Sequence, residues 1–281
     1  MNEQTKKKNK IIKSIFYTLL VLLVIISFIP FYMMIVNATR SNADILRNGF
    51  TLIPGQAIVD NYNVLLEYMN LWRGFANSLI VALAVTVLSS YFSALTAFGF
   101  SVYKFKGSNF LFVTILVLMM VPGQLGLIGF YDIMRTFGFL DTYIPLIVPP
   151  IASTFTVFFL RQFLSSVLHS SLIEAARIDG AHEFTIFHKI GVPMMMPAIS
   201  TMAIFSFIGS WNNYILPLVV LFSPEKYTLP VMMGALRGSQ VAQNLGAMYL
   251  GIAISVVPIM TAFIFLSKYI ISSISAGAVK E

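Results

Sequence analysis

The chain has 281 residues, of which 58% are hydrophobic and only 10% are charged, and its mean hydropathy is +0.84. Soluble domains are roughly 45–50% apolar and about a quarter charged, so this composition is typical of a membrane protein and argues against a soluble domain. The net charge of +7 would also fit a nucleic-acid-binding protein, but the basic residues lie where membrane topology places them. The absence of Cys excludes disulfides and zinc–thiolate sites.

Six apolar stretches are long enough to cross a bilayer, because a hydrocarbon core about 30 Å thick needs a helix of about 20 apolar residues. We predict an all-α membrane protein with spans at residues 11–36, 77–103, 110–130, 143–160, 198–222 and 244–271. Tails at residues 1–10 and 272–281 flank these spans. The first stretch is too long for the apolar region of a cleaved signal peptide, so we expect it to remain as a span.

The Lys and Arg residues predict the orientation of the spans, because cytoplasmic loops carry an excess of these residues. With both termini in the cytoplasm, about two thirds of the 18 Lys and Arg residues fall on the cytoplasmic side. The segment 161–197, between the fourth and fifth spans, is then the longest cytoplasmic connection.

This connection contains the stretch "SLIEAARIDGAHEF", which mixes charged with small residues in a chain that otherwise avoids charge. Good helix formers precede Gly180, which would end a first short helix. A second, amphipathic helix would follow, with Pro193 and Pro197 closing it before the fifth span. The alternative is a solvated amphipathic linker with no further role.

None of the 11 acidic residues lies inside a predicted span. Ion-coupled carriers place ionisable groups at membrane depth, so a secondary carrier is poorly supported. The sequence has no P-loop, HExxH or G-x-S-x-G motif, so we predict a protein that is not an enzyme and has no P-loop ATP site. We expect no bound cofactor or metal, and we expect His169, His182 and His188 to be solvated loop residues.

Two spans contain neutral polar side chains. Trp211, Asn212, Asn213 and Tyr214 lie in the middle of the fifth span, and Gln124 follows a Pro–Gly pair in the third. Such residues often hydrogen-bond between helices, and that interpretation stays open. The functional alternative is the lining of a path for a hydroxyl-rich solute, because amides both donate to and accept from hydroxyls.

The connection 161–197 also carries a family signature. Glu174-Ala175-Ala176, then Gly180, and nine residues later "IGVP" from Ile190 to Pro193, resemble the EAA motif in the permease subunits of bacterial ABC importers. Val192 stands where that motif usually has Leu. The stretches "EAARIDGA", "SWNNYILPL" and the tail "GAVK" resemble the carbohydrate-uptake branch, in particular the G subunit of maltose-type permeases, although Asn213 replaces a common acid.

The resemblance implies the type I ABC importer fold, with a coupling helix in the connection that docks into a separate ATPase. The residues implied in this coupling are Glu174, Ala175, Ala176, Asp179, Gly180, Ile190 and Pro193, and Gly277 and Lys280 in the tail would also contact the ATPase. The implied partners are a second permease subunit, two ATPase copies that use ATP and Mg, and an extracellular binding protein that delivers a sugar. The lipid bilayer of the bacterial plasma membrane would surround the spans, and nucleic acid is not an implied partner. Import of glycerol phosphate or a polyol by the same branch is the alternative.

Overall fold

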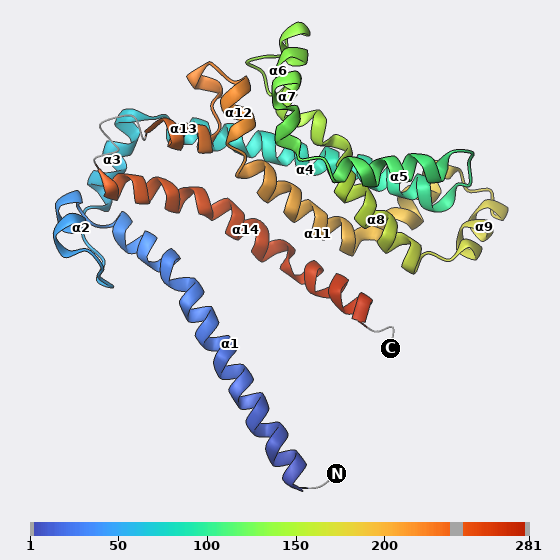
Figure 1. Ribbon diagram of the computed structural model, residues 1–281, viewed down its shortest axis with the longest axis horizontal. Coiled ribbons are helices and arrows are strands. Elements are labelled where there is room, and N and C mark those ends of the chain that lie inside the picture. Colours follow the sequence, from blue (N-terminus) through green and yellow to red (C-terminus); the bar gives the residue numbers. More distant parts are fainter. Residues whose placement is uncertain (1–2, 237–243, 279–281) are drawn as a thin grey trace. The chain divides into compact units, whose positions relative to one another are not determined.

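The computed structural model describes residues 3–236 and 244–278, and every regular element in this part of the chain is a helix (Figure 1). The prediction of an all-α protein is therefore confirmed for the described residues. The α-helices are α1 (Glu3–Ala38), α2 (Asn42–Asn48), α3 (Ile58–Tyr68), α4 (Leu71–Val102), α5 (Ser108–Met119), α6 (Leu127–Thr136), α7 (Ile144–Ile147), α8 (Thr154–Val167), α9 (Ser170–Ile178), α10 (Glu183–Ile186), α11 (Val192–Trp211), α12 (Ile215–Val220), α13 (Leu229–Leu236) and α14 (Leu245–Ala278). Shorter turns are η1 (Gly123–Gly126), η2 (Pro149–Ala152), the π-helical η3 (Phe187–Gly191) and η4 (Pro224–Lys226).

Among the described residues, five helical stretches are long and apolar enough to cross a membrane. They are Asn9–Ala38, Leu71–Val102, Ile144–Val167, Glu183–Trp211 and Leu245–Phe265. A sixth candidate is the pair Ser108–Met119 and Gly123–Thr136, whose two parts are bent by 91°. Each of the six overlaps one of the apolar stretches in the sequence.

The third apolar stretch, residues 110–130, is broken rather than continuous. Helix α5 ends at Met119, and Pro122 has an extended backbone with ψ 122° before η1 leads into α6. Proline has no N–H to continue a helix, and it also disfavours helical geometry in the preceding residue. The Pro122–Gly123 pair therefore turns the chain sharply between α5 and α6.

The fourth stretch extends further than the predicted end at residue 160. Helix α8 continues to Val167, and Leu160 and Leu164 on it are both fully buried. The apolar face of α8 therefore remains buried beyond Arg161. The charged side chain of Arg161 interrupts the apolar sequence without ending the helix. Helix α8 packs against both α5 and α11 (Figure 1).

The prediction that Pro193 and Pro197 close a helix before the fifth span is wrong. The stretch Glu183–Trp211 continues from α10 through the π-helical turn η3 into α11. Pro193 lies in the first turn of α11, directly after the π-helical turn η3. At this position the missing N–H of proline costs little, because the hydrogen-bonding pattern changes there from π-helical to α-helical. Pro197 lies inside α11, so the connecting segment and the fifth span share one helical stretch.

The chain divides into two compact units, which are described separately. The first comprises Met1–Leu71 and Met233–Val256. In it, the buried Arg40 donates from Nε to Asp44 Oδ2 at 2.6 Å and from an Nη to Asn37 Oδ1 at 3.1 Å. Asn61 on α3 donates to the carbonyls of Ala38 and Arg40 at 2.8 and 2.9 Å. The buried charge is therefore paired and hydrogen-bonded, as a buried guanidinium requires.

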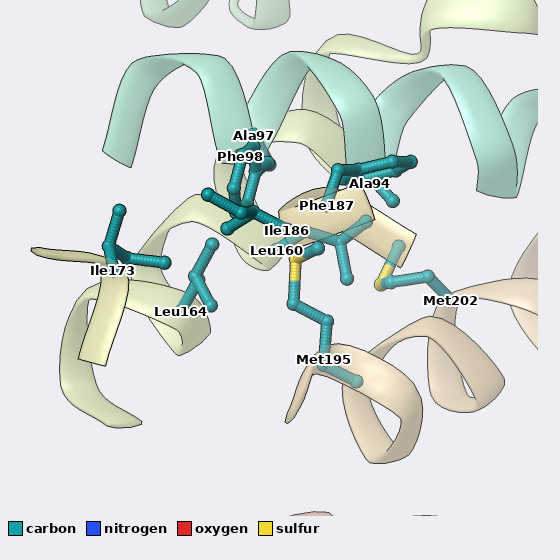
Figure 2. Close-up of a cluster of buried hydrophobic side chains, with 11 residues drawn as sticks. Ala94, Ala97, Phe98, Leu160, Leu164, Ile173, Ile186, Phe187, Met195 and Met202 are labelled. Carbon is teal, nitrogen blue, oxygen red and sulfur yellow. The ribbon is translucent and has the colours of Figure 1, made fainter. Parts of the chain in front are cut away.

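The second unit comprises Trp72–Met232 and Val257–Glu281 and contains an apolar cluster where α4, α8, α9, α10, η3 and α11 meet (Figure 2). The cluster consists of Ala94, Ala97, Phe98, Leu160, Leu164, Ile173, Ile186, Phe187, Met195, Ala198 and Met202. Because Ile173, Ile186 and Phe187 belong to the connecting segment, this core fixes the segment against the ends of the long helices. Burying large apolar side chains contributes about 1.5–3 kcal/mol each.

Candidate functional site

The connecting segment folds as a helix, a left-handed turn and a second helix. Helix α9 ends at Ile178, Asp179 caps it, and Gly180 follows with φ +75°. The predicted helix end at Gly180 is confirmed, and its physical reason is that left-handed backbone is costly for residues with a Cβ. The chain then re-enters helix at Glu183.

The segment buries one side and exposes the other. Ile173 is 3% exposed in the core, whereas Ile178 is 86% exposed and Phe184 is 65% exposed. The structure places Glu174, Ala175, Asp179, Gly180 and Pro193 on the exposed surface. Ala176 and Ile190 are half-buried against the core. Large exposed apolar side chains beside small residues give this surface the character of a docking site for another protein.

An ion pair that sequence reasoning missed holds the two helices of the segment together. Arg177 donates from Nε to Glu183 Oε1 at 2.7 Å, across the turn at Gly180. Tyr103, just after α4, donates its hydroxyl to Glu183 Oε2 at 2.6 Å. The hydrogen bond to Glu183 raises the pKa of the Arg177 guanidinium, which stays charged. The contact ties the connecting segment to the end of α4.

A cavity of about 790 Å³ lies at the other end of the Glu183–Trp211 stretch. Its lining comes from η1, α6, η2 and the break between α11 and α12, and consists of Gly123, Gln124, Gly126, Leu127, Phe130, Pro149, Gly209, Asn212, Asn213, Tyr214, Ile215 and Leu216. Four of the five predicted path residues therefore line one cavity, although they come from two parts of the chain about 90 residues apart.

Trp211 is the predicted path residue that does not line this cavity. Its side chain is 2% exposed, and its ring lies 5.4 Å from that of Phe75 and 5.9 Å from that of Phe207, centroid to centroid. Aromatic rings at these distances pack favourably. Trp211 therefore anchors the end of α11 in the apolar interior, which favours the packing interpretation for this residue.

The polar residues do not lie in mid-helix as predicted, because the fifth apolar stretch breaks at them. Helix α11 ends at Trp211 and α12 begins at Ile215. Asn213 Oδ1 accepts a hydrogen bond from the Leu216 backbone N–H at 3.4 Å, which replaces a helical bond. Asn side chains compete with the backbone in this way, and Pro217 has no N–H to restore the ladder.

The cavity offers hydrogen-bonding groups that have no partner in the described part of the chain. Among the described residues, the side chains of Gln124, Asn212 and Tyr214 make no hydrogen bond. Irregular backbone at membrane depth is tolerated only where it is buried in protein or lines a cavity. Two broken helices that meet at a cavity with free amides and a phenol are the arrangement expected of a site for a polar solute.

A second feature that the sequence did not reveal is a set of hydrogen bonds that joins the loop at Asp141 to the loop at residues 222–226. Asp141, with φ 56°, accepts hydrogen bonds from the backbone N–H groups of Phe222 and Ser223 at 2.9 and 3.0 Å. Its carboxylate also accepts from the Ser223 hydroxyl at 2.6 Å and from Lys226 Nζ at 2.9 Å. The bond from the Ser223 side chain, followed by the backbone bonds, holds the pKa of Asp141 far below its usual range.

Of the two tail residues predicted to contact the ATPase, the structure describes one. Gly277 lies near the end of α14, and Lys280 lies outside the described residues. Among the described residues, no group of three or more His, Cys, Asp or Glu side chains is placed to hold a metal ion. The connecting segment and the cavity are therefore the two candidate sites in the described part of the chain.

A helical chain with up to six apolar spans and a cavity at two broken helices has the architecture of a membrane transport protein. Residues 89–276 match the family of binding-protein-dependent transport system inner membrane components, and the chain belongs to this family. It is therefore a permease and a multi-pass inner-membrane protein.

Several relatives span nearly the whole length of the chain. It is 35% identical over 258 residues to the arabinooligosaccharides transport system permease protein AraQ of Halalkalibacterium halodurans, covering 91% of this chain and 92% of the relative. It is 34% identical over 274 residues to AraQ of Bacillus subtilis, covering 96% of each. It is 30% identical over 267 residues to the diacetylchitobiose uptake system permease protein NgcG of Streptomyces coelicolor, covering 94% and 88%.

A solved structure shares the fold. A chain of a bacterial ABC transporter involved in the import of the acidic polysaccharide alginate superposes with a TM-score of 0.79 and 23% identity, covering 96% of this chain and 99% of that one. The chain thus has the type I ABC permease fold.

Proposed function

We propose that this chain is the transmembrane permease subunit of an ATP-driven importer and forms half of the path for a neutral sugar or oligosaccharide. The proposal is based on the cavity in which Gln124, Asn212 and Tyr214 present polar groups with no hydrogen-bond partner among the described residues. Its volume of about 790 Å³ lies within the range of roughly 300–1,000 Å³ usual for small-molecule sites. The names of the relatives, which refer to arabinooligosaccharides and diacetylchitobiose, support a saccharide.

The lining of the cavity favours a neutral saccharide over glycerol phosphate, the alternative within the same branch. All twelve lining residues are uncharged. A phosphate is usually bound by Arg, Lys or several backbone N–H groups, whereas sugar hydroxyls suit amides and a phenol ring. A polyol would suit the same amides, so the test below includes one.

We further propose that the connecting segment couples this permease to a separate ATPase. The exposed surface at Glu174, Ala175, Asp179 and Gly180 supports the docking role, because small residues allow close approach of another backbone. The 29-residue stretch Glu183–Trp211 runs from this segment to the cavity, a distance of roughly 40 Å at 1.5 Å per residue. A displacement of the segment would therefore reach the cavity through a single helical stretch.

The proposed complex contains a second permease subunit, two ATPase copies that use ATP and Mg, and an extracellular binding protein. In this arrangement both termini and the connecting segment lie in the cytoplasm, in line with the distribution of Lys and Arg. The cavity, at the opposite end of Glu183–Trp211, then lies toward the side from which the binding protein delivers the solute. Gly277 and Lys280 in the tail are proposed ATPase contacts.

The solute site is tested by transport in cells that carry the intact importer. We expect Asn212→Leu to lower uptake of labelled arabinooligosaccharides or of another saccharide in a panel that includes a polyol and glycerol phosphate. The loss of one hydrogen bond of about 0.5–1.5 kcal/mol predicts roughly a two- to twelvefold effect. The matched control is Asn63→Leu, because Asn63 is exposed on α3 and lies outside the cavity lining. Equal uptake by both variants would leave Asn212 with no role in the path.

The coupling role is tested separately, by ATP hydrolysis in the purified complex. We expect Glu174→Lys to abolish stimulation of the ATPase by the loaded binding protein while the permease remains in the membrane. Ser165→Lys is the control, because it also introduces a lysine at an exposed position, on α8 outside the motif. Normal stimulation in Glu174→Lys at wild-type expression would remove the coupling assignment and leave the solute proposal untouched.

A further inference from the structure

A second cavity, of about 620 Å³, carries positive charge and lies between the end of α4 and the start of α5. It is lined by Phe100, Ser101, Tyr103, Lys104, Phe105, Lys106, Gly107, Ser108, Asn109 and Arg161. Three of these side chains are cationic and none is acidic. Among the described residues, Lys104, Lys106 and Arg161 take part in no salt bridge. The pocket therefore holds positive charge that no acidic side chain in the described ranges pairs with.

Arg161 is held in place at the wall of this pocket by an aromatic ring, with no anionic partner in residues 3–236 and 244–278. Its guanidinium carbon lies 3.8 Å from the centre of the Phe112 ring, a cation–π contact that fixes the side chain. Its buried Nε has no hydrogen-bond partner among the described atoms. An unsatisfied buried donor costs free energy, and an anion in the pocket would remove that cost.

The backbone adds a smaller contribution with the same preference for negative charge. Gly107 precedes the 12-residue helix α5 and provides no side-chain cap, and the first residues of α5, Ser108 and Asn109, belong to the pocket lining. The positive end of a helix favours anions such as phosphate. This contribution strengthens the effect of the three cationic side chains and would not define a site by itself.

The surroundings of the pocket distinguish a lipid from a free ion. Phe105 in the lining is 44% exposed, Phe110 and Leu111 at the start of α5 are 74% and 47% exposed, and α5 belongs to a candidate membrane span. Basic groups beside exposed apolar side chains match the two chemical parts of a phospholipid, since basic pockets between spans on the cytoplasmic side bind anionic headgroups. A free phosphate would gain nothing from the apolar rim.

We propose that this pocket binds the phosphate group of an anionic phospholipid such as phosphatidylglycerol, with the acyl chains along the exposed face of α5. The inference rests on the orientation given under the proposed function, which places the pocket at the cytoplasmic surface. Binding of lipid is measured without transport, so its failure and a failure of the transport proposal are distinguishable.

The test is native mass spectrometry of the full chain in a neutral detergent, titrated with phosphatidylglycerol or phosphatidylcholine. We expect preferential binding of phosphatidylglycerol, and a weakening in Lys104→Gln/Lys106→Gln of roughly fivefold for each Lys removed. The matched control is Lys10→Gln/Lys13→Gln, which removes the same charge from exposed positions on α1. Lys104→Arg/Lys106→Arg keeps the charge and should retain the affinity, which separates a loss of binding from a loss of folding.

Three results would overturn the proposal. Equal weakening in the pocket variant and the α1 control would show diffuse attraction to the basic surface. Equal affinity for phosphatidylcholine would show that the anionic charge is not recognised. Displacement of phosphatidylglycerol by inorganic phosphate at comparable concentration would identify a site for free phosphate instead.

Discussion

Gly191, in the π-helical turn η3, lies close against an aromatic ring of α4. A Cβ added to it would lie 2.7 and 2.8 Å from Cδ2 and Cε2 of Phe98 on α4. Phe98 is 2% exposed, and its ring packs edge-on against that of Phe187 with 5.4 Å between centroids. The ring cannot retreat without opening this cluster, so Gly191→Ala should destabilise the protein.

The size of the effect follows from two opposing contributions. Carbon atoms prefer separations of about 3.5–4.0 Å, so the Phe98 ring or the turn must move by roughly 1 Å. Overpacking of a close-packed core costs about 1–3 kcal/mol. Replacing Gly by Ala in a helix returns about 0.5–1 kcal/mol. Because the added Cβ would lie 2.7 Å from a buried ring, the overpacking cost falls in the upper part of its range, and the expected net loss for Gly191→Ala is about 1–2 kcal/mol in the free energy of unfolding.

Gly209, near the end of α11, provides the matched control. A Cβ at Gly209 would have nothing within 4 Å, so only the gain of about 0.5–1 kcal/mol should remain in Gly209→Ala. The assay is equilibrium unfolding of the purified chain in mixed micelles with increasing SDS, followed by the fluorescence of Trp72 and Trp211. A lower midpoint for Gly191→Ala and a higher one for Gly209→Ala are expected. Equal stability of Gly191→Ala and wild type would refute the packing argument.

Two further predictions use the same unfolding assay. Asp141 has a lowered pKa in the folded state because Ser223 and its neighbours donate to the carboxylate, so its contribution to stability is present above the unfolded pKa of about 3.9 and is lost as the pH falls through the folded pKa. Wild type should lose stability on acidification below about pH 4, and Asp141→Asn should lose less over that range; identical acid profiles would contradict this. At Gly180, where φ is +75°, a β-branched residue should cost at least about 1–2 kcal/mol. Gly180→Val should therefore unfold at a lower SDS concentration than Gly180→Asn, because Asn tolerates left-handed backbone. Equal midpoints would show that the turn rearranges.

The positions of the long helices could be predicted from sequence because the length of an apolar run determines whether it can span a bilayer. The residues at which the helices break could not be predicted from the sequence. Pro122 ends a helix, whereas Pro197 and Pro258 lie inside helices. The difference depends on whether neighbouring groups satisfy the carbonyls that each proline leaves free, and this is a property of the packed structure.

The candidate sites divide in the same way. Gln124 and Asn212 could be identified in the sequence because an amide within an apolar stretch needs a polar partner or a cavity. Trp211 could not be assigned, because an indole ring serves equally in a core and in a binding site. Tyr103 was missed because its partner Glu183 lies 80 residues further along the chain, and no local pattern signals that contact.

The two candidate sites lie at the two ends of the helical stretch Glu183–Trp211. The packing along this stretch indicates where movement would occur. At the end near the connecting segment, Phe187 and Met195 are buried in the core, and Gly191 contacts Phe98 without space for a methyl group. At the other end the backbone ladder is interrupted at Asn212, where the lining of the cavity is half-exposed or exposed. Close-packed interiors transmit displacement, whereas irregular backbone absorbs it. Under the proposed coupling, Glu183–Trp211 would therefore move as a unit with α4 and α8, and the break at Asn212 would change the shape of the cavity.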